Sequence, residues 1–182
     1  MPSNNTSSKE KRSEAVILQS LLHLSAREYR KTLSKLREHL AVVDRKASLN
    51  QWNDINYNHV PSKANLKYRN AFLKHDEERR NAYLTSLYKG NDAVKINANS
   101  MFLYDIVQAY VKGDNFWDSS LNPYDETLEQ LWNAQDAPKD YDDILVIRDG
   151  SGSMGKKLSG NSSVTALSVA DSIALYCVQH NK

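Results

Sequence analysis

The chain has 182 residues, of which 40% are hydrophobic and 25% charged, and its 24 Lys+Arg nearly balance its 22 Asp+Glu. These proportions are typical of a folded protein and exclude a wholly disordered chain. A single cysteine, Cys177, excludes an internal disulfide framework and a four-cysteine zinc site. No stretch approaches the ~20 apolar residues of a membrane span, and residues 1–13 lack the apolar centre of a secretory signal. The sequence therefore predicts a cytoplasmic protein with no membrane contact.

The small net charge of +2 conceals an uneven distribution along the chain. Residues 1–100 carry 18 basic and 10 acidic side chains, whereas residues 101–182 carry 6 basic and 12 acidic side chains. The two regions thus have net charges of +8 and −6. A basic region joined to an acidic one suggests two functional parts, although solvated helix faces produce the same pattern.

Most of the sequence predicts helices. After a polar, disordered tail at residues 1–13, leucines recur every three or four residues from position 14 to about 45, which predicts one long amphipathic helix. Pro61 and the capping residue Ser62 then begin a second helix. Further helices are expected from Asp76 to the stop at Gly90, over residues 101–111, and over residues 124–134 with Asp125 in the first turn. We therefore expect a helical domain over residues 14–138.

The pattern changes after residue 138. Residues 144–147 (ILVI) are a short, continuous apolar run, which is typical of a buried parallel strand. A glycine- and serine-rich loop follows, and residues 164–179 predict a helix. A strand, a loop and a helix are how an open α/β domain begins, but such a domain needs several of these units. We therefore expect residues 139–182 to be a partial α/β domain.

Three patterns overlap in the loop at residues 149–157. Residues 150–155 form G-x-G-x-x-G, but the helix that should meet a dinucleotide begins several residues too late. Residues 150–156 form G-x-x-x-x-G-K, but Lys157 replaces the magnesium-binding Ser or Thr of a phosphate loop. Asp149 would also place a carboxylate beside the phosphate. Both nucleotide interpretations are therefore weaker than the third.

The third pattern is D-x-S-x-S, formed by Asp149, Ser151 and Ser153. Alternate residues of an extended segment point to one side, so one carboxylate and two hydroxyls can converge. Such hard oxygen ligands suit Mg²⁺, which prefers about six oxygens and retains some waters. Ligands at the carboxyl ends of strands also fit the general rule for open α/β sheets. Because one carboxylate leaves the ion positively charged, a partner's acidic side chain could complete the shell.

The motif ILVIRDGSGSM resembles the metal-ion-dependent adhesion site (MIDAS) of von Willebrand factor A domains. The segments YNHVPSKANLKYRNAFLKHDEERRNAYL, KINANSMFLYDIV and LWNAQ, which precede it, resemble the uncharacterised family called domain of unknown function 2828. The resemblance covers roughly residues 50–182. That family is similar in layout to the Ro autoantigen proteins, in which helical repeats (the TROVE module) precede an A domain.

This resemblance implies a mainly α protein, with a HEAT-like or TROVE-like helical region followed by the first strand and helix of a Rossmann-like A domain. It also implies that Asp149, Ser151 and Ser153 belong to the first metal-binding loop. The A-domain pattern adds a threonine and a second aspartate from later loops, which lie beyond Lys182, so we expect the Mg²⁺ site to be incomplete in this chain. Arg148 departs from the pattern, and strand alternation predicts that it points away from the metal.

A second candidate site lies in the helical region, where basic side chains alternate with Tyr68 and Phe72. Basic and aromatic residues together can hold a phosphate backbone and stack bases, and the Ro-type helical ring implies RNA as the ligand. The alternative is that the two rings face the core and nearby acids offset the charges. The basic candidates are Lys63, Lys67, Arg69, Lys74, Arg79 and Arg80.

The sequence as a whole favours a non-enzymatic binding protein. Its expected partners are a protein that presents a carboxylate to the Mg²⁺ loop and an RNA, with no sequence-specific DNA binding. The alternative is a nucleotide-binding enzyme that uses residues 150–156 to hold phosphates.

Overall fold

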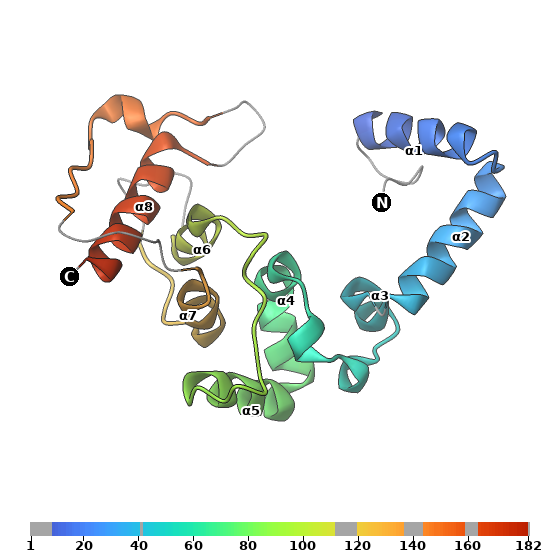
Figure 1. Cartoon of the computed structure of the whole chain (residues 1–182), viewed down its shortest axis with the longest axis horizontal. Coiled ribbons are helices and arrows are strands. Elements are labelled where there is room, and N and C mark those ends of the chain that lie inside the picture. Colours follow the sequence, from blue (N-terminus) through green and yellow to red (C-terminus); the bar gives the residue numbers. More distant parts are fainter. Residues whose placement is uncertain (1–8, 41, 112–119, 137–143, 159–163, 182) are drawn as a thin grey trace. The chain divides into compact units, whose positions relative to one another are not determined.

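A computed structural model describes residues 9–40, 42–111, 120–136, 144–158 and 164–181 of the chain (Figure 1). Over these residues the protein is mainly helical, as predicted, with isolated β-bridges and no β-sheet. None of the described helices is long and apolar enough to cross a membrane. The chain divides into two compact units, Met1–Ile55 and Asn56–Lys182. The predicted border near residue 138 falls outside the described residues and stays a prediction.

The first unit contains α1 (Lys9–Leu21), α2 (Ala26–His39), α3 (Val43–Ser48) and the short helix η1 (Trp52–Asp54). The prediction of one unbroken helix over residues 14–45 is wrong, and the helical part begins earlier, at Lys9. The first break follows from a capping box. The Ser25 amide donates to Glu28 Oε2 at 2.9 Å, and the Glu28 amide donates to Ser25 Oγ at 3.3 Å. These two bonds start a new helix, and His23 turns the chain with a φ of 51°.

The second unit begins with η2 (Tyr57–His59), α4 (Ser62–His75) and α5 (Glu77–Tyr88). Ser62 is the first residue of α4 rather than its cap, because its hydroxyl hydrogen-bonds the Ser100 hydroxyl at 2.6 Å. Asp76 stands at the cap position of α5, but its carboxylate accepts from the Tyr57 hydroxyl at 2.7 Å and from Arg79 rather than from the backbone amides of the helix. Gly90 ends this region with a φ of +68°, as the sequence predicts.

Two further helices, α6 (Leu103–Tyr110) and α7 (Glu126–Asn133), complete the core of the second unit. Asp125 caps α7 by accepting hydrogen bonds from the amides of Thr127 and Leu128, so it lies just before the helix rather than in its first turn. Both helices contribute to one cluster of buried apolar side chains: Ile96, Met101, Ile106, Leu128 and Leu131.

The final helix, α8 (Ala166–His180), confirms the helix predicted over residues 164–179 and packs against α6 (Figure 1). The buried strand predicted at residues 144–147 is wrong. The segment lies outside any sheet, and its Leu145 and Ile147 are 83% and 86% exposed. A strand is held by hydrogen bonds to a neighbouring strand, and the part of the chain that the structure describes offers none. The α/β fold of the A domain therefore stays a prediction.

Candidate metal-binding loop

The D-x-S-x-S motif follows residues 144–148: Asp149 and Ser151 precede the short helix η4 (Gly152–Gly155), and Ser153 lies within it. The C-terminal end of the loop is closed by a bridge between Lys157 and Thr165 and by a hydrogen bond from the Leu158 amide to the Val164 carbonyl at 2.9 Å. Thr165 then caps α8 by accepting from the Ser168 amide at 3.1 Å. These local contacts fix where the loop ends and α8 begins.

The structure brings the three predicted oxygen-bearing side chains together. The Ser151 amide donates to Asp149 Oδ1 at 2.8 Å, and the hydroxyls of Ser151 and Ser153 are 3.0 Å apart. Hydrogen bonds from the Ser151 backbone and hydroxyl hold the pKa of Asp149 below its usual value, and the Arg148 charge adds to this effect. All three side chains are exposed. The loop therefore presents an ionised carboxylate and two hydroxyls to solvent.

Arg148 lies beside the loop, where its charge acts on Asp149, and its predicted turn away from the metal ligands stays a prediction. Its guanidinium Nε pairs with Asp171 Oδ1 on α8. A Cβ added to Gly150 would lie 2.7 Å from Arg148 Nη1, so the guanidinium lies against the backbone of the loop. A side chain at position 150 would therefore require the flexible end of Arg148 to shift. The sequence analysis missed the role of Asp171, because nothing in the chain order indicates which helix residue faces Arg148.

The donor set fits part of a Mg²⁺ shell. Carboxylate and hydroxyl oxygens are the hard ligands that the ion prefers, and exposure leaves room for waters. The three side chains supply only one negative charge. Among the described residues no cluster of three or more His, Cys, Asp or Glu could bind a metal by itself. Asp149, Ser151 and Ser153 can thus form one side of a shell that waters and a ligand complete.

The geometry of the loop differs from that of a phosphate cradle. In a phosphate loop a helix begins at once and points its free amides at the anion. Here α8 begins only at Ala166, and the last two glycines of the pattern, Gly152 and Gly155, lie in the short helix η4 instead. The Ser151 amide is also occupied by the Asp149 carboxylate.

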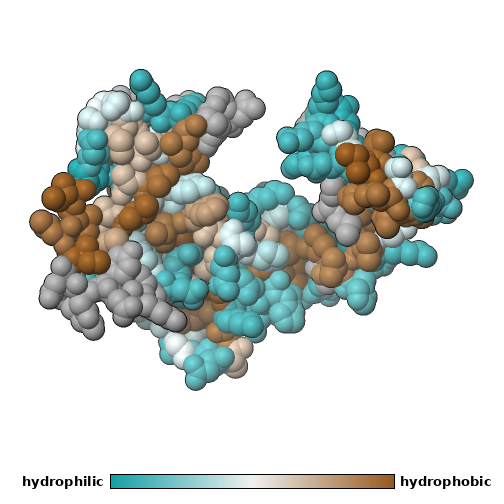
Figure 2. Space-filling view, turned by 45° about the horizontal axis from the view of Figure 1, so that its top comes forward, coloured by the Kyte–Doolittle hydropathy of each residue, from teal (hydrophilic) through white to brown (hydrophobic). Residues whose placement is uncertain are grey.

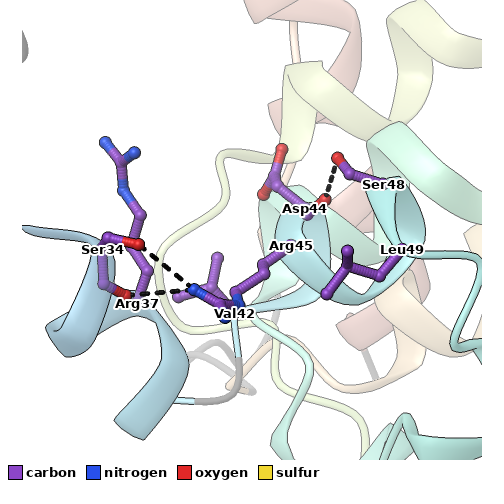
Figure 3. A pocket seen from close by; sticks show the side chains of 7 residues that line it. All are labelled: Ser34, Arg37, Val42, Asp44, Arg45, Ser48 and Leu49. Carbon is purple, nitrogen blue, oxygen red and sulfur yellow. Dashed lines mark hydrogen bonds between the residues drawn. The ribbon is translucent and has the colours of Figure 1, made fainter.

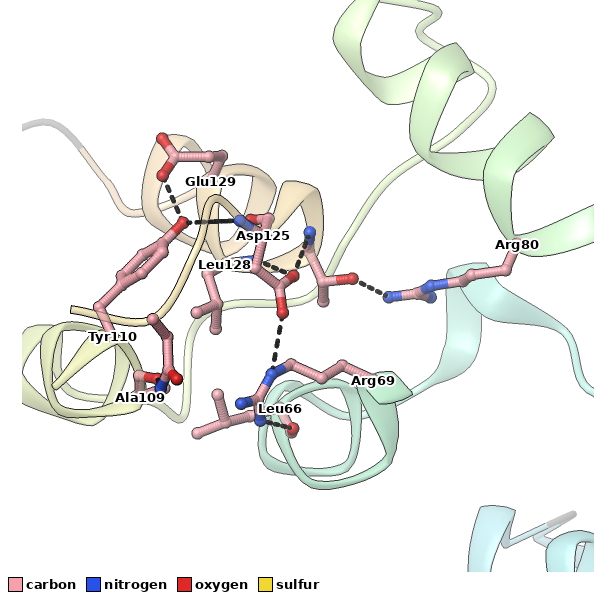
Figure 4. Close-up of polar contacts among 10 residues, drawn as sticks. Leu66, Arg69, Arg80, Ala109, Tyr110, Asp125, Leu128 and Glu129 are labelled. Carbon is pink, nitrogen blue, oxygen red and sulfur yellow. Dashed lines mark hydrogen bonds and ion pairs between the residues drawn. The ribbon is translucent and has the colours of Figure 1, made fainter. Parts of the chain in front are cut away.

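The six basic residues predicted to bind RNA do not share one surface. Arg80 is completely buried, and Arg69 pairs with Asp125 at 3.0 Å (Figure 4). Arg79 pairs with Asp76 at 2.9 Å. The structure leaves Lys63, Lys67 and Lys74 exposed on α4. Of the two predicted aromatic partners, Phe72 is completely buried and Tyr68 is partly buried.

An aromatic pair that was not predicted from the sequence lies next to one of these lysines, Lys63. The rings of Phe102 and Tyr104 are stacked with centroids 5.2 Å apart, and Phe102 is 59% exposed. Lys63 Nζ lies 5.9 Å from the Phe102 centroid, and Lys67 Nζ lies 4.5 Å from the Tyr68 centroid. We call these five residues the aromatic–lysine surface.

A hollow in the first unit contains two arginines but offers no strong anion site (Figure 3). Arg45 donates to the Ser34 carbonyl at 3.2 Å and pairs with Glu38 at the same distance. Asp44 also lines the hollow. Its arginine charge is therefore offset by carboxylates.

Comparison of the sequence with known protein families assigns this mainly helical chain to one of them. The chain belongs to the family called domain of unknown function 2828, whose model matches residues 2–138. It is similar to the uncharacterized protein L728 of Acanthamoeba polyphaga mimivirus, with 29% identity in an alignment of 154 residues that covers 75% of this chain and 25% of that protein. The chain thus spans about a quarter of the length of its relative. No solved structure matches it.

Proposed function

We propose that the protein is a non-enzymatic binding module in which Asp149, Ser151 and Ser153 hold Mg²⁺ for a carboxylate on a protein ligand. The observation that carries this proposal is the convergence of the three side chains, with 2.8 Å between the Ser151 amide and Asp149 Oδ1 and 3.0 Å between the two hydroxyls. The pattern and its position before a helix support an A-type loop.

The charges around the loop favour an acidic ligand. Asp149 offsets only part of the ion's charge, so a carboxylate from outside would complete the shell and neutralise the ion. Lys156 and Lys157 are exposed directly after η4 and add positive charge beside the loop. The family match ends at residue 138, before the loop, so the proposal of an A-type loop depends on the loop's own residues.

A titration with two ligands separates this function from nucleotide binding. We expect the wild-type protein to bind Mg²⁺. Binding should be lost in Asp149→Ala and kept in Lys156→Ala. Asp92→Asn, which removes another exposed carboxylate, is the matched control and should bind normally. ATP binding that is lost in Lys156→Ala and kept in Asp149→Ala would instead establish the nucleotide-binding alternative.

A second candidate function, RNA binding by a TROVE-like helical region, is favoured by the aromatic–lysine surface. An exposed ring stacked on a second ring offers a face to a base, and Lys63 beside it can contact a phosphate. We expect Phe102→Ala to weaken binding of a single-stranded oligouridine probe about tenfold, since base stacking contributes ~1–3 kcal/mol. Lys63→Glu should also weaken it, whereas Lys89→Glu serves as the control. An affinity that is the same at low and high salt would contradict this function.

A further inference from the structure

Helix α2 of the first unit carries a surplus of positive charge. Its two carboxylates are both engaged, Glu28 in the capping box with Ser25 and Glu38 in an ion pair with Arg45 at 3.2 Å. Its basic side chains, in contrast, are all exposed and make no ion pair or side-chain hydrogen bond with any of the described residues. We call these side chains the basic face of α2, and they are Arg27, Arg30, Lys31, Lys35 and Arg37.

The basic face has two rows of charge. At about 100° per residue of helix, its five positions span an arc of about 160° and, at about 1.5 Å per residue, a length of about 15 Å. One flank of the arc holds Arg30 and Arg37, the other holds Lys31 and Lys35, and Arg27 lies between them. Because the helix is rigid, the spacing of the two rows is fixed before any ligand binds.

The apolar stripe of α2 lies on the opposite side and packs against α1. Tyr29 and Leu33 are 2% and 5% exposed and form one buried cluster with Ala15 of α1. Leu36 and Leu40 extend the stripe and are more exposed. Figure 2 shows hydrophilic atoms around a hydrophobic patch on the first unit. Packing of the stripe against α1 therefore leaves the basic face turned to solvent.

The arrangement of the charges favours a DNA double helix among nucleic acids. The major groove of B-DNA is ~12 Å wide and admits an α-helix, so that each row of cations would meet the phosphates of one strand. The major groove of duplex RNA is too narrow for this. Single strands are held by stacking on aromatic rings, and Tyr29, the only Phe, Tyr or Trp of α2, is buried.

An anionic membrane fits the same helix less well. An amphipathic helix lies on a bilayer with its apolar stripe in the lipid and its polar face towards water. On α2 this orientation would turn the basic face away from the lipid phosphates, and the stripe is already occupied in part by α1. The charges and the packing thus point to the same ligand.

We propose that the basic face of α2 binds the phosphates of double-stranded DNA, with the helix in the major groove. The contacts are independent of base sequence, because phosphate contacts position a protein without reading bases. The binding surface belongs to the first unit, whereas the metal-binding loop and the aromatic–lysine surface belong to the second. This inference therefore does not rest on either proposed function.

Fluorescence anisotropy of the full chain with two short DNA duplexes of unrelated sequence, in EDTA, tests the proposal without Mg²⁺. We expect equal affinity for both duplexes and, for five phosphate contacts, a slope of about −4 to −5 in a plot of log affinity against log salt. Arg30→Gln/Lys31→Gln removes one cation from each row and should weaken binding about tenfold and reduce the slope by about 2.

The matched control, Lys89→Gln/Lys95→Gln, removes two exposed cations of the second unit and should bind as the wild type does. Circular dichroism establishes that each variant is folded. A wild type that does not bind, or a control that loses as much affinity as Arg30→Gln/Lys31→Gln, would overturn the proposal.

A pair of substitutions within α2 tests which side of the helix binds. Ser34→Glu places an acid among the cations and should weaken binding, whereas Thr32→Glu adds the same charge outside the arc and should change it little. Phe102→Ala should bind duplex DNA as the wild type does. Equal effects of the two glutamates, or a loss in Phe102→Ala, would place the binding elsewhere and overturn the assignment to α2.

Two other polyanions test the choice of ligand. We expect duplex RNA of the same length and vesicles of phosphatidylserine and phosphatidylcholine to bind more weakly than duplex DNA, because neither offers a groove that accepts the helix. Duplex RNA or vesicles that bind as tightly as duplex DNA would contradict a helix in the major groove.

Discussion

Arg80 is an unusual residue because its charge lies inside the core of the second unit. Its guanidinium carbon lies 4.9 Å from the Tyr57 ring centroid, 5.1 Å from that of Phe72 and 5.2 Å from that of Tyr83. It donates to Asn65 Oδ1 and Thr127 Oγ1, both at 3.2 Å, while its Nε has no hydrogen-bond partner among the described residues (Figure 4). Burial lowers the pKa of Arg80. Cation–π contacts and two hydrogen bonds thus offset the cost of a buried charge.

Replacing Arg80 should therefore destabilise the protein, and the loss of stability should be larger the more packing the new side chain removes. We expect Arg80→Ala to reduce the free energy of unfolding by about 3 kcal/mol, since it leaves a cavity and two unpaired polar groups. Arg80→Met retains the volume and should lose less. Urea unfolding measures both changes, with the exposed Lys74→Ala, expected within about 0.5 kcal/mol of wild type, as the control. An alanine variant as stable as wild type would show that Arg80 does not hold the core together.

The lowered pKa of Asp149 leads to a prediction about the pH dependence of Mg²⁺ binding. Because its hydrogen bonds with Ser151 lower its pKa below the ordinary 3.8, the carboxylate stays ionised in moderately acidic solution. We expect the affinity for Mg²⁺ to be equal at pH 7 and pH 5 and to fall only below the usual aspartate range. Calorimetric titration at the two pH values measures this. Affinity that is lost between pH 7 and pH 5 would contradict the assignment of Asp149 as the ligand.

At the scale of elements, local signals in the sequence predicted helices well and tertiary effects poorly. Gly90, Asp125 and the helix after residue 164 carry their own stop, cap and periodicity, so the predictions there were close. The break near Ser25 also had a local signal, the Ser-x-x-Glu capping box, which the leucine periodicity obscured. In contrast, nothing local distinguishes buried Arg80 from exposed Arg79, because distant rings decide which one is enclosed. The prediction of a buried strand at residues 144–147 was wrong for the same reason, because a strand must pair with another strand that can lie far away in the chain.

The capping box that begins α2 can be tested directly. Ser25→Ala removes the hydrogen bond to the Glu28 amide and should lower the stability of the first unit by about 1 kcal/mol. Ser25→Asp retains an acceptor and should behave like wild type. Hydrogen exchange of the Glu28 amide measures the change. Unchanged protection in the alanine variant would mean that the packing of Tyr29 and Leu33, rather than the cap, fixes where α2 begins.

At the scale of the whole molecule, the second unit depends on buried tyrosines. Burial, followed by the hydrogen bond to Asp76, raises the pKa of Tyr57, and burial raises the pKa of Tyr83 to about 12. Since the folded pKa values exceed the ordinary value of 10.0, the folded state favours the neutral phenols. Their contribution to stability is complete below pH 10 and is lost as the pH rises through the folded values.

We therefore expect the urea midpoint of the protein to be constant from pH 7 to pH 9 and to fall steeply above pH 10. Tyr83→Phe should be less stable at neutral pH, because the hydrogen bond to the Lys95 carbonyl is lost, but should show a shallower fall in alkali. Urea titrations followed by circular dichroism test both expectations. A wild-type midpoint that is the same at pH 8 and pH 11 would contradict the assignment of ionisable phenols to this core.

The most direct measurement of the central claim is a Mg²⁺ titration of the isotope-labelled protein, followed by the amide resonances of residues 149–155. We predict that the Ser151 and Ser153 signals shift and reach saturation in the wild-type protein, that they stay unchanged in Asp149→Asn, and that Asp92→Asn behaves like wild type. Signals that do not move with Mg²⁺, or that move equally in Asp149→Asn, would contradict a metal-binding loop built on these three side chains.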